Sequence, residues 1–89
     1  MSTKIKEAVK EFCKNDYWKE YYEKAPSENC KKYIEYTFVQ SLFGVDEDNS
    51  KNKKEVSNKL KYNDWKHLHK YAGNNPFKIF CEKKMKETK

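Results

Sequence analysis

The sequence predicts an all-α protein, a compact bundle of about five or six short helices around a central buried helix at residues 28–43. Apolar residues recur at helical spacing in most segments. Only two Gly and two Pro occur, which disfavours a turn-rich β architecture. Aromatic residues make up 16% of the chain, and each buried ring removes about 150–250 Å² from water, so even 89 residues can fill a core. We expect residues 1–89 to form a single domain.

The first segment is typical of an amphipathic helix capped by Thr3, with Ile5, Val9 and Phe12 on one face. Continued without a break, that helix would place Asp16 inside its apolar stripe. A break at residues 15–16 removes the conflict, and we expect Asp16 to cap a second short helix that carries the aromatic segment WKEYY. Pro26 ends this helix, because the residue before a proline avoids helical backbone angles.

The third segment predicts the central helix, with Ser27 as its N-cap and Gly44 just beyond its C-terminus. Apolar side chains surround residues 28–43 on nearly all sides, which predicts burial on most sides. Residues 33–39 are rich in aromatic and β-branched side chains, so a strand is the alternative for that stretch.

Residues 45–53 predict an acidic and polar loop that separates the two halves of the chain. A short helix marked by Val56 and Leu60 should follow it. Asn63 or Asp64 should cap the next helix, with His67 outward, and Asn75 should cap the last one. The inner face of the helix after residue 63 is expected to hold Trp65, Leu68, His69 and Ala72.

Charge is distributed unevenly along the chain. Residues 1–50 hold 8 Lys and 10 acidic residues, a net charge of −2, whereas residues 51–89 hold 12 Lys and 4 acidic residues, a net charge of +8. All 20 basic residues are Lys, so the chain lacks the planar guanidinium that pairs bidentately with guanine or phosphate. The basic half therefore favours contact with a phosphate backbone, with weak sequence preference.

Nucleic acid is the first partner class that the sequence suggests. Three short helices in the basic half are similar in order to a three-helix DNA-binding layout, an analogy of fold alone. The candidate phosphate-binding residues are Lys66, Lys70, Lys78, Lys83, Lys84 and Lys86.

A protein partner is the second class, for a module of inhibitor, immunity or adaptor type. Four aromatic residues fall within six positions at residues 17–22. We expect the cluster to enter the core through Trp18 and Tyr21, yet so dense a cluster should leave some ring exposed. Partly exposed Trp and Tyr are favoured anchors at protein interfaces. Trp18, Tyr21 and Tyr22 are therefore the candidate interface residues.

No residue pattern predicts catalysis, a metal or a cofactor, so a non-enzymatic binding or regulatory role is expected. Asp46, Asp48 and Ser50 alternate as in an EF-hand loop, but the sequence lacks the required Gly and Glu that follow. His67 and His69 diverge by about 200° on a helix and do not form a ligand pair. Three scattered cysteines predict free, reduced thiols, and no apolar run fits a signal peptide or membrane span, so a cytoplasmic protein is expected.

Overall fold

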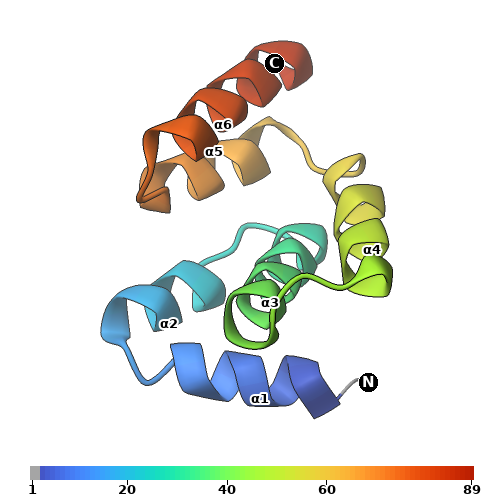
Figure 1. The fold of residues 1–89 in the computed structure, drawn as a ribbon. Coiled ribbons are helices and arrows are strands. Elements are labelled where there is room, and N and C mark those ends of the chain that lie inside the picture. Colours follow the sequence, from blue (N-terminus) through green and yellow to red (C-terminus); the bar gives the residue numbers. More distant parts are fainter. Residues whose placement is uncertain (1–2) are drawn as a thin grey trace.

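Six helices run through residues 3–89, the part of the chain that this computed structural model describes (Figure 1). Those residues contain no strand, which confirms the all-α prediction and places residues 33–39 in a helix. In chain order the helices are α1 (Thr3–Phe12), α2 (Asp16–Glu23), α3 (Glu28–Phe43), α4 (Glu47–Ser57), α5 (Tyr62–Tyr71) and α6 (Asn75–Thr88).

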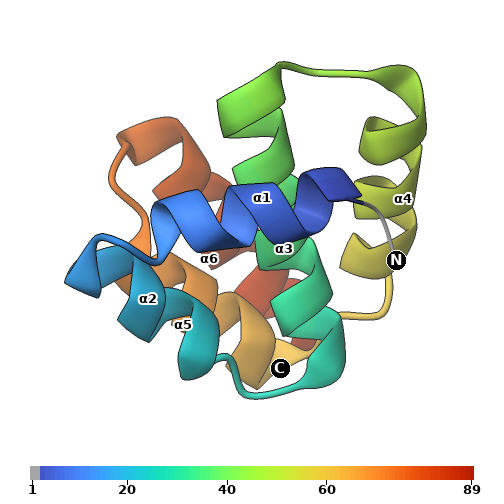
Figure 2. The ribbon, with the colours of Figure 1, turned by 90° about the horizontal axis from the view of Figure 1, so that it is seen from below.

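Helix α3 is the central helix, as predicted, and α1, α2 and α4 all pack against it. Figure 2 shows α1 lying across it. The rings of Phe12 and Phe38 stack with their centroids 4.4 Å apart, which joins α1 to α3. The last turn differs from the expectation of burial on most sides, because Leu42 and Phe43 remain 42% and 44% exposed. The buried residues of α3 are Cys30, Tyr33, Ile34, Phe38 and Val39.

Helices α5 and α6 pack against each other and lie at the opposite end of the molecule from α1 (Figure 1). Large aromatic side chains connect this pair to the other helices. The Trp65 ring is fully buried and meets Tyr33 of α3 edge to face, with centroids 5.7 Å apart. Tyr71 lies 5.2 Å from Tyr21 of α2, again between ring centroids. Contacts between aromatic rings therefore connect α5 to α2 and α3, whose backbones make few close contacts with it.

The prediction of a loop at residues 45–53 is wrong, because α4 begins at Glu47. Asp46 caps it by accepting a hydrogen bond from the Asn49 backbone N–H at 2.8 Å, and two acidic residues follow in the first turn, where the helix dipole favours them. Asn49 is buried and its side-chain amide donates to the Tyr36 carbonyl at 3.0 Å. Helix α4 is therefore joined to α3 by polar contacts. This is why its sequence shows no apolar stripe that would predict a helix.

This arrangement also corrects the three-helix analogy for the basic half. Helix α4 packs mainly against α3, whereas α5 and α6 pack against each other. The last three helices therefore do not form a separate three-helix unit. No helix within residues 3–89 has the length and apolar character that a bilayer crossing would require.

Several helix starts lie earlier than predicted. Asn15, not Asp16, caps α2, and its side chain accepts from the Tyr17 N–H at 2.8 Å. Asn74, not Asn75, caps α6 in the same way. Thr3, expected as a cap, already lies within α1. Ser27 caps α3 as predicted, by accepting from the Cys30 N–H.

Asp64 connects the starts of α3 and α5. Its side chain is buried, and one carboxylate oxygen accepts from the Ser27 hydroxyl at 2.8 Å while the other accepts from the Lys61 backbone N–H at 2.9 Å. Asp64 was expected to precede α5 as its cap, but it lies in the first turn, where its carboxylate reaches back to the residue before the helix. One side chain thus fixes the position of α5 against α3.

Replacing Asp64 with alanine is expected to lower the free energy of unfolding by about 2–4 kcal/mol, because two hydrogen bonds to a charged acceptor disappear and both donors are left behind. Urea denaturation followed by circular dichroism measures this change. The matched control is Glu55→Ala, at an exposed position in the last turn of α4, with an expected change below about 0.5 kcal/mol. Equal effects of the two substitutions would contradict a connecting role for Asp64.

Candidate polyanion-binding surface

The six lysines predicted to contact phosphate are accessible in different degrees. Five of them are exposed, and Lys84 is half-buried with its ammonium 5.6 Å from the centroid of the Phe80 ring. Another lysine of the basic half is less accessible: Lys53 donates to the Gln40 side chain at 3.1 Å, and burial lowers its pKa. The lysines of the basic half therefore differ in how accessible their ammonium groups are to solvent.

Lys66 and Lys70 lie four residues apart on α5, a spacing that places both on the same side of the helix. They line a depression of about 510 Å³ together with Lys24, the residue that ends α2. The depression has no acidic residue in its lining. The full set of lining residues is Lys24, Pro26, Asn63, Lys66, His67, His69, Lys70 and Met85.

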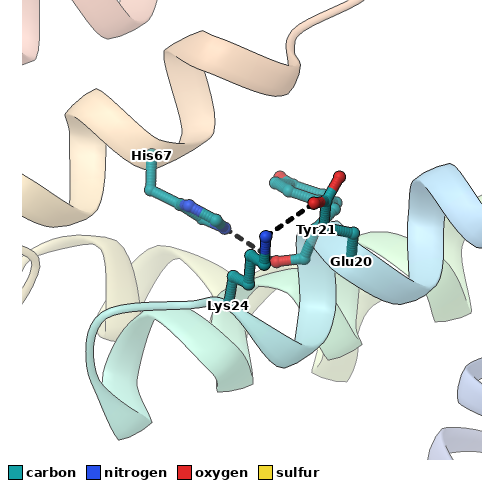
Figure 3. A network of polar contacts seen from close by, with 4 residues as sticks. All are labelled: Glu20, Tyr21, Lys24 and His67. Carbon is teal, nitrogen blue, oxygen red and sulfur yellow. Dashed lines mark hydrogen bonds and ion pairs between the residues drawn. The ribbon is translucent and has the colours of Figure 1, made fainter.

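His67 holds the two sides of this depression together. Its Nε2 lies 2.7 Å from the Tyr21 carbonyl oxygen, and because a carbonyl only accepts, Nε2 carries the hydrogen (Figure 3). The imidazole also stacks on the Tyr21 ring, with centroids 5.5 Å apart. The prediction that His67 points outward is therefore wrong. The histidine connects α5 to α2 and brings Lys24 beside the lysines of α5.

His69, expected on the inner face of its helix, is partly exposed instead. Its Nε2 lies 3.2 Å from the Glu82 carboxylate of α6. The buried residues of α5 are Asp64, Trp65, Leu68 and Tyr71, so the inner face is rotated away from His69 and Ala72. The reason is that α5 is covered from two directions, by α6 and by the rings of α2 and α3.

Two acidic residues lie near the depression without lining it. Glu20 accepts from the Lys24 ammonium at 2.7 Å, in an exposed pair that Figure 3 shows beside His67. This hydrogen bond raises the pKa of Lys24 and lowers that of Glu20. Glu82 is engaged by His69. Within residues 3–89, Lys66 and Lys70 have no carboxylate within ion-pair distance, so their charges remain available to an external anion.

The other four predicted lysines belong to α6 and do not line the depression. At about 100° per residue, Lys83 and Lys86 lie about 60° apart on one side of the helix, whereas Lys84 diverges from both by about 100° or more. Lys78 and Lys83 flank the exposed Ile79. The structure thus brings two of the six predicted residues into one basic hollow and distributes the rest along α6.

The aromatic residues predicted as a protein interface are mostly part of the core. Tyr21 is only 4% exposed, so it is not available to a partner. Trp18 is half-buried between Phe12, Tyr21 and Phe38, and Tyr22 donates its hydroxyl to the Glu35 carboxylate. Entry into the core through Trp18 and Tyr21 is therefore confirmed. The exposed ring of the cluster is Tyr17, whose hydroxyl donates to the Tyr71 carbonyl.

Lys24 is the residue that sequence reasoning missed. It lies in the near-neutral half, at the end of a helix, and only the packing of α2 on α5 through His67 brings it to the hollow. Among the described residues no three His, Cys, Asp or Glu side chains gather in a way that could hold a metal ion. Comparison of the chain with protein-family models, curated proteins and solved structures gave no match.

Proposed function

We propose that the protein is a non-enzymatic binding module that contacts the phosphate backbone of nucleic acid through its basic C-terminal half. The observation that supports the proposal is the basic hollow, where Lys24, Lys66 and Lys70 surround about 510 Å³ with no carboxylate in the lining. Lys66 and Lys70 have no carboxylate partner among the described residues, and Lys24 has only the exposed Glu20, so ammonium groups around this concave surface suit an anion that carries repeated charges.

The chemistry of the hollow also suggests what kind of recognition to expect. Lysine acts as a point charge and makes no bidentate contact with a base edge, so it binds phosphate and carries little sequence information. The exposed lysines of α6 extend the positive surface beyond the hollow. Binding is therefore expected to be strongly salt-dependent and similar for different sequences.

The test is fluorescence anisotropy of a labelled duplex titrated with protein between about 50 and 200 mM salt, a range over which binding through several phosphates loses orders of magnitude in affinity. Replacing Lys24, Lys66 and Lys70 with Gln should weaken binding to all sequences alike. It should also reduce the slope of log affinity against log salt by about 2.7, because each phosphate that is no longer neutralised lowers the slope by about 0.9.

The matched control removes the same three charges from α6, through Lys78→Gln, Lys83→Gln and Lys86→Gln. A smaller decrease in slope for the control than for the hollow variant supports the hollow as the main binding surface. Equal decreases would assign binding to net charge alone and contradict the proposal. Absence of binding to duplex and to single strands at low salt would eliminate nucleic acid as the partner.

A protein-interaction module is the second candidate, and one observation favours it. Leu42, Phe43 and Val45 are all exposed at the end of α3, where apolar side chains gather on the surface. This surface differs from the residues expected from the sequence, of which Tyr21 is buried.

A further inference from the structure

Two apolar patches on the surface have rims of opposite charge. Residues 3–89 expose six large apolar or aromatic side chains, and all but Tyr17 belong to these two patches. The first patch, here the acidic corner, lies where α3 meets α4 and consists of Leu42, Phe43, Val45, Asp46, Glu47 and Asp48. The second, here the basic ridge, lies on α6 and consists of Lys78, Ile79, Phe80, Lys83 and Lys84.

The acidic corner is hollowed. Its three carboxylate residues line a depression of about 530 Å³ between α4 and the start of α1. Val45, which directly precedes Asp46 in the chain, is 78% exposed, the highest value among the exposed large apolar residues. Lys4 of α1 also lines the depression, with its ammonium 5.8 Å from the centroid of the Phe43 ring. The corner thus combines an apolar edge with a negative hollow.

The basic ridge has the opposite character. Ile79 is 65% exposed on the outer side of α6. Lys83 follows Ile79 by four residues, and Lys84 follows Phe80 by four, so each apolar residue has an ammonium on its own side of the helix. The one carboxylate near Ile79, that of Glu82, is engaged by His69 at 3.2 Å. Phe80 is partly covered by Trp65, with ring centroids 5.5 Å apart, which leaves Ile79 as the side chain that protrudes most.

We infer that the acidic corner of one copy of this chain receives the basic ridge of a second copy. The two surfaces match in all three respects that govern association: each exposes apolar side chains, their rims carry opposite charge, and one is hollow where the other is a helix face. Because the two surfaces differ, the contact is head-to-tail. Each copy keeps one unused surface, so further copies add in a row.

The small size of the patches sets the strength of the contact. Stable interfaces bury about 800 Å² on each partner, which two patches of a few residues each approach only in part. We therefore expect weak association, with a dissociation constant near about 0.1 mM. Salt should weaken it, because the screening length falls from about 10 Å at 0.1 M to about 3 Å at 1 M.

Sedimentation velocity of the purified chain without nucleic acid tests the inference. The weight-average sedimentation coefficient should rise with protein concentration, and the rise should shrink in about 1 M salt. Val45→Lys, which places a cation in the acidic corner, and Ile79→Gln, which removes the protruding apolar group from the ridge, should each weaken association at least about tenfold. Both positions are largely exposed, so circular dichroism should show both variants folded.

Mixing the two variants is the decisive experiment. The Val45→Lys chain keeps an intact ridge and the Ile79→Gln chain keeps an intact corner, so an equimolar mixture should form dimers that do not extend further. Asn58→Lys adds the same charge as Val45→Lys at an exposed residue that ends α4, at the opposite end of that helix from the acidic corner, and it should associate like the unchanged chain. A monomer at every concentration would overturn the inference. Association that survives either substitution, or a mixture that stays monomeric, would overturn it equally.

Discussion

Replacement of Trp65 with alanine is expected to lower the free energy of unfolding by about 3–5 kcal/mol, the usual cost of deleting a fully buried large ring. Trp65 has no exposed surface, and its ring touches Tyr33 on one side and Phe80 on the other. A domain of this length has a total stability of about 5–13 kcal/mol, so the substitution removes a large share of it. Urea denaturation followed by circular dichroism gives the value.

The same substitution should affect the parts of the molecule unequally. Because Trp65 joins α5 and α6 to α3, amide hydrogen exchange should accelerate most in α5 and α6, while α1 and α3 keep the Phe12–Phe38 stack. Phe43→Ala, at a ring that is 44% exposed, is the matched control and should cost less than about 1 kcal/mol. A Trp65 variant as stable as this control would contradict the central role of the indole.

Alkaline pH should unfold the protein. Burial raises the pKa of the Cys30 thiol from its usual 9.0 to about 12, with the Asp64 charge adding to the shift, and burial with the nearby Glu82 charge does the same for Cys81. Burial also raises the pKa of Tyr21 and Tyr33. These groups bind protons more tightly in the folded chain, so their contribution to stability is complete below about pH 9 and is lost as the pH rises toward 12.

The helix signal at 222 nm, followed against pH, measures this loss, and absorbance of thiolate and tyrosinate should rise together with unfolding. The Cys30→Ala and Cys81→Ala double variant should begin to lose stability at higher pH than the parent, because two buried acidic groups are gone. Cys13→Ala is the control, since Cys13 is only half-buried, and it should leave the midpoint nearly unchanged. Ionisation of all three thiols near pH 9 without unfolding would show that Cys30 and Cys81 are accessible.

Elements with strong local signals were predictable from the sequence. Helix α3 has a serine cap, an apolar surface and a glycine at its end, and each of these signals acts within a few residues. The break near residue 15 followed from one aspartate in an apolar stripe. The three cysteines are free, as predicted, with Cys30 and Cys81 buried. Helix starts shifted by a residue because neighbouring Asn and Asp compete for the same capping position.

Features that depend on contacts between distant residues were not predictable in this way. Helix α4 is bound to α3 through Asn49, Lys53 and Gln40, and polar pairs of this kind leave no periodic apolar pattern. The roles of His67 and His69 depend on which neighbours cover α5. Lys24 joins the hollow only because α2 and α5 meet, and residues 1–50 by themselves give no sign of it.

Positive charge is distributed unevenly in space. Residues 62–88, which form α5 and α6 at one end of the molecule, hold 6 Lys and 3 acidic residues, a net charge of +3, whereas residues 3–43, which form α1 to α3, hold 8 Lys and 7 acidic residues, a net charge of +1. The end formed by α5 and α6 is therefore the more positive one. In the field of a polyanion such a molecule experiences a torque before it makes contact, so it arrives with its basic end already turned toward the target. Productive collisions should then be a larger fraction of all encounters at low ionic strength, and association rates should fall as salt screens that torque.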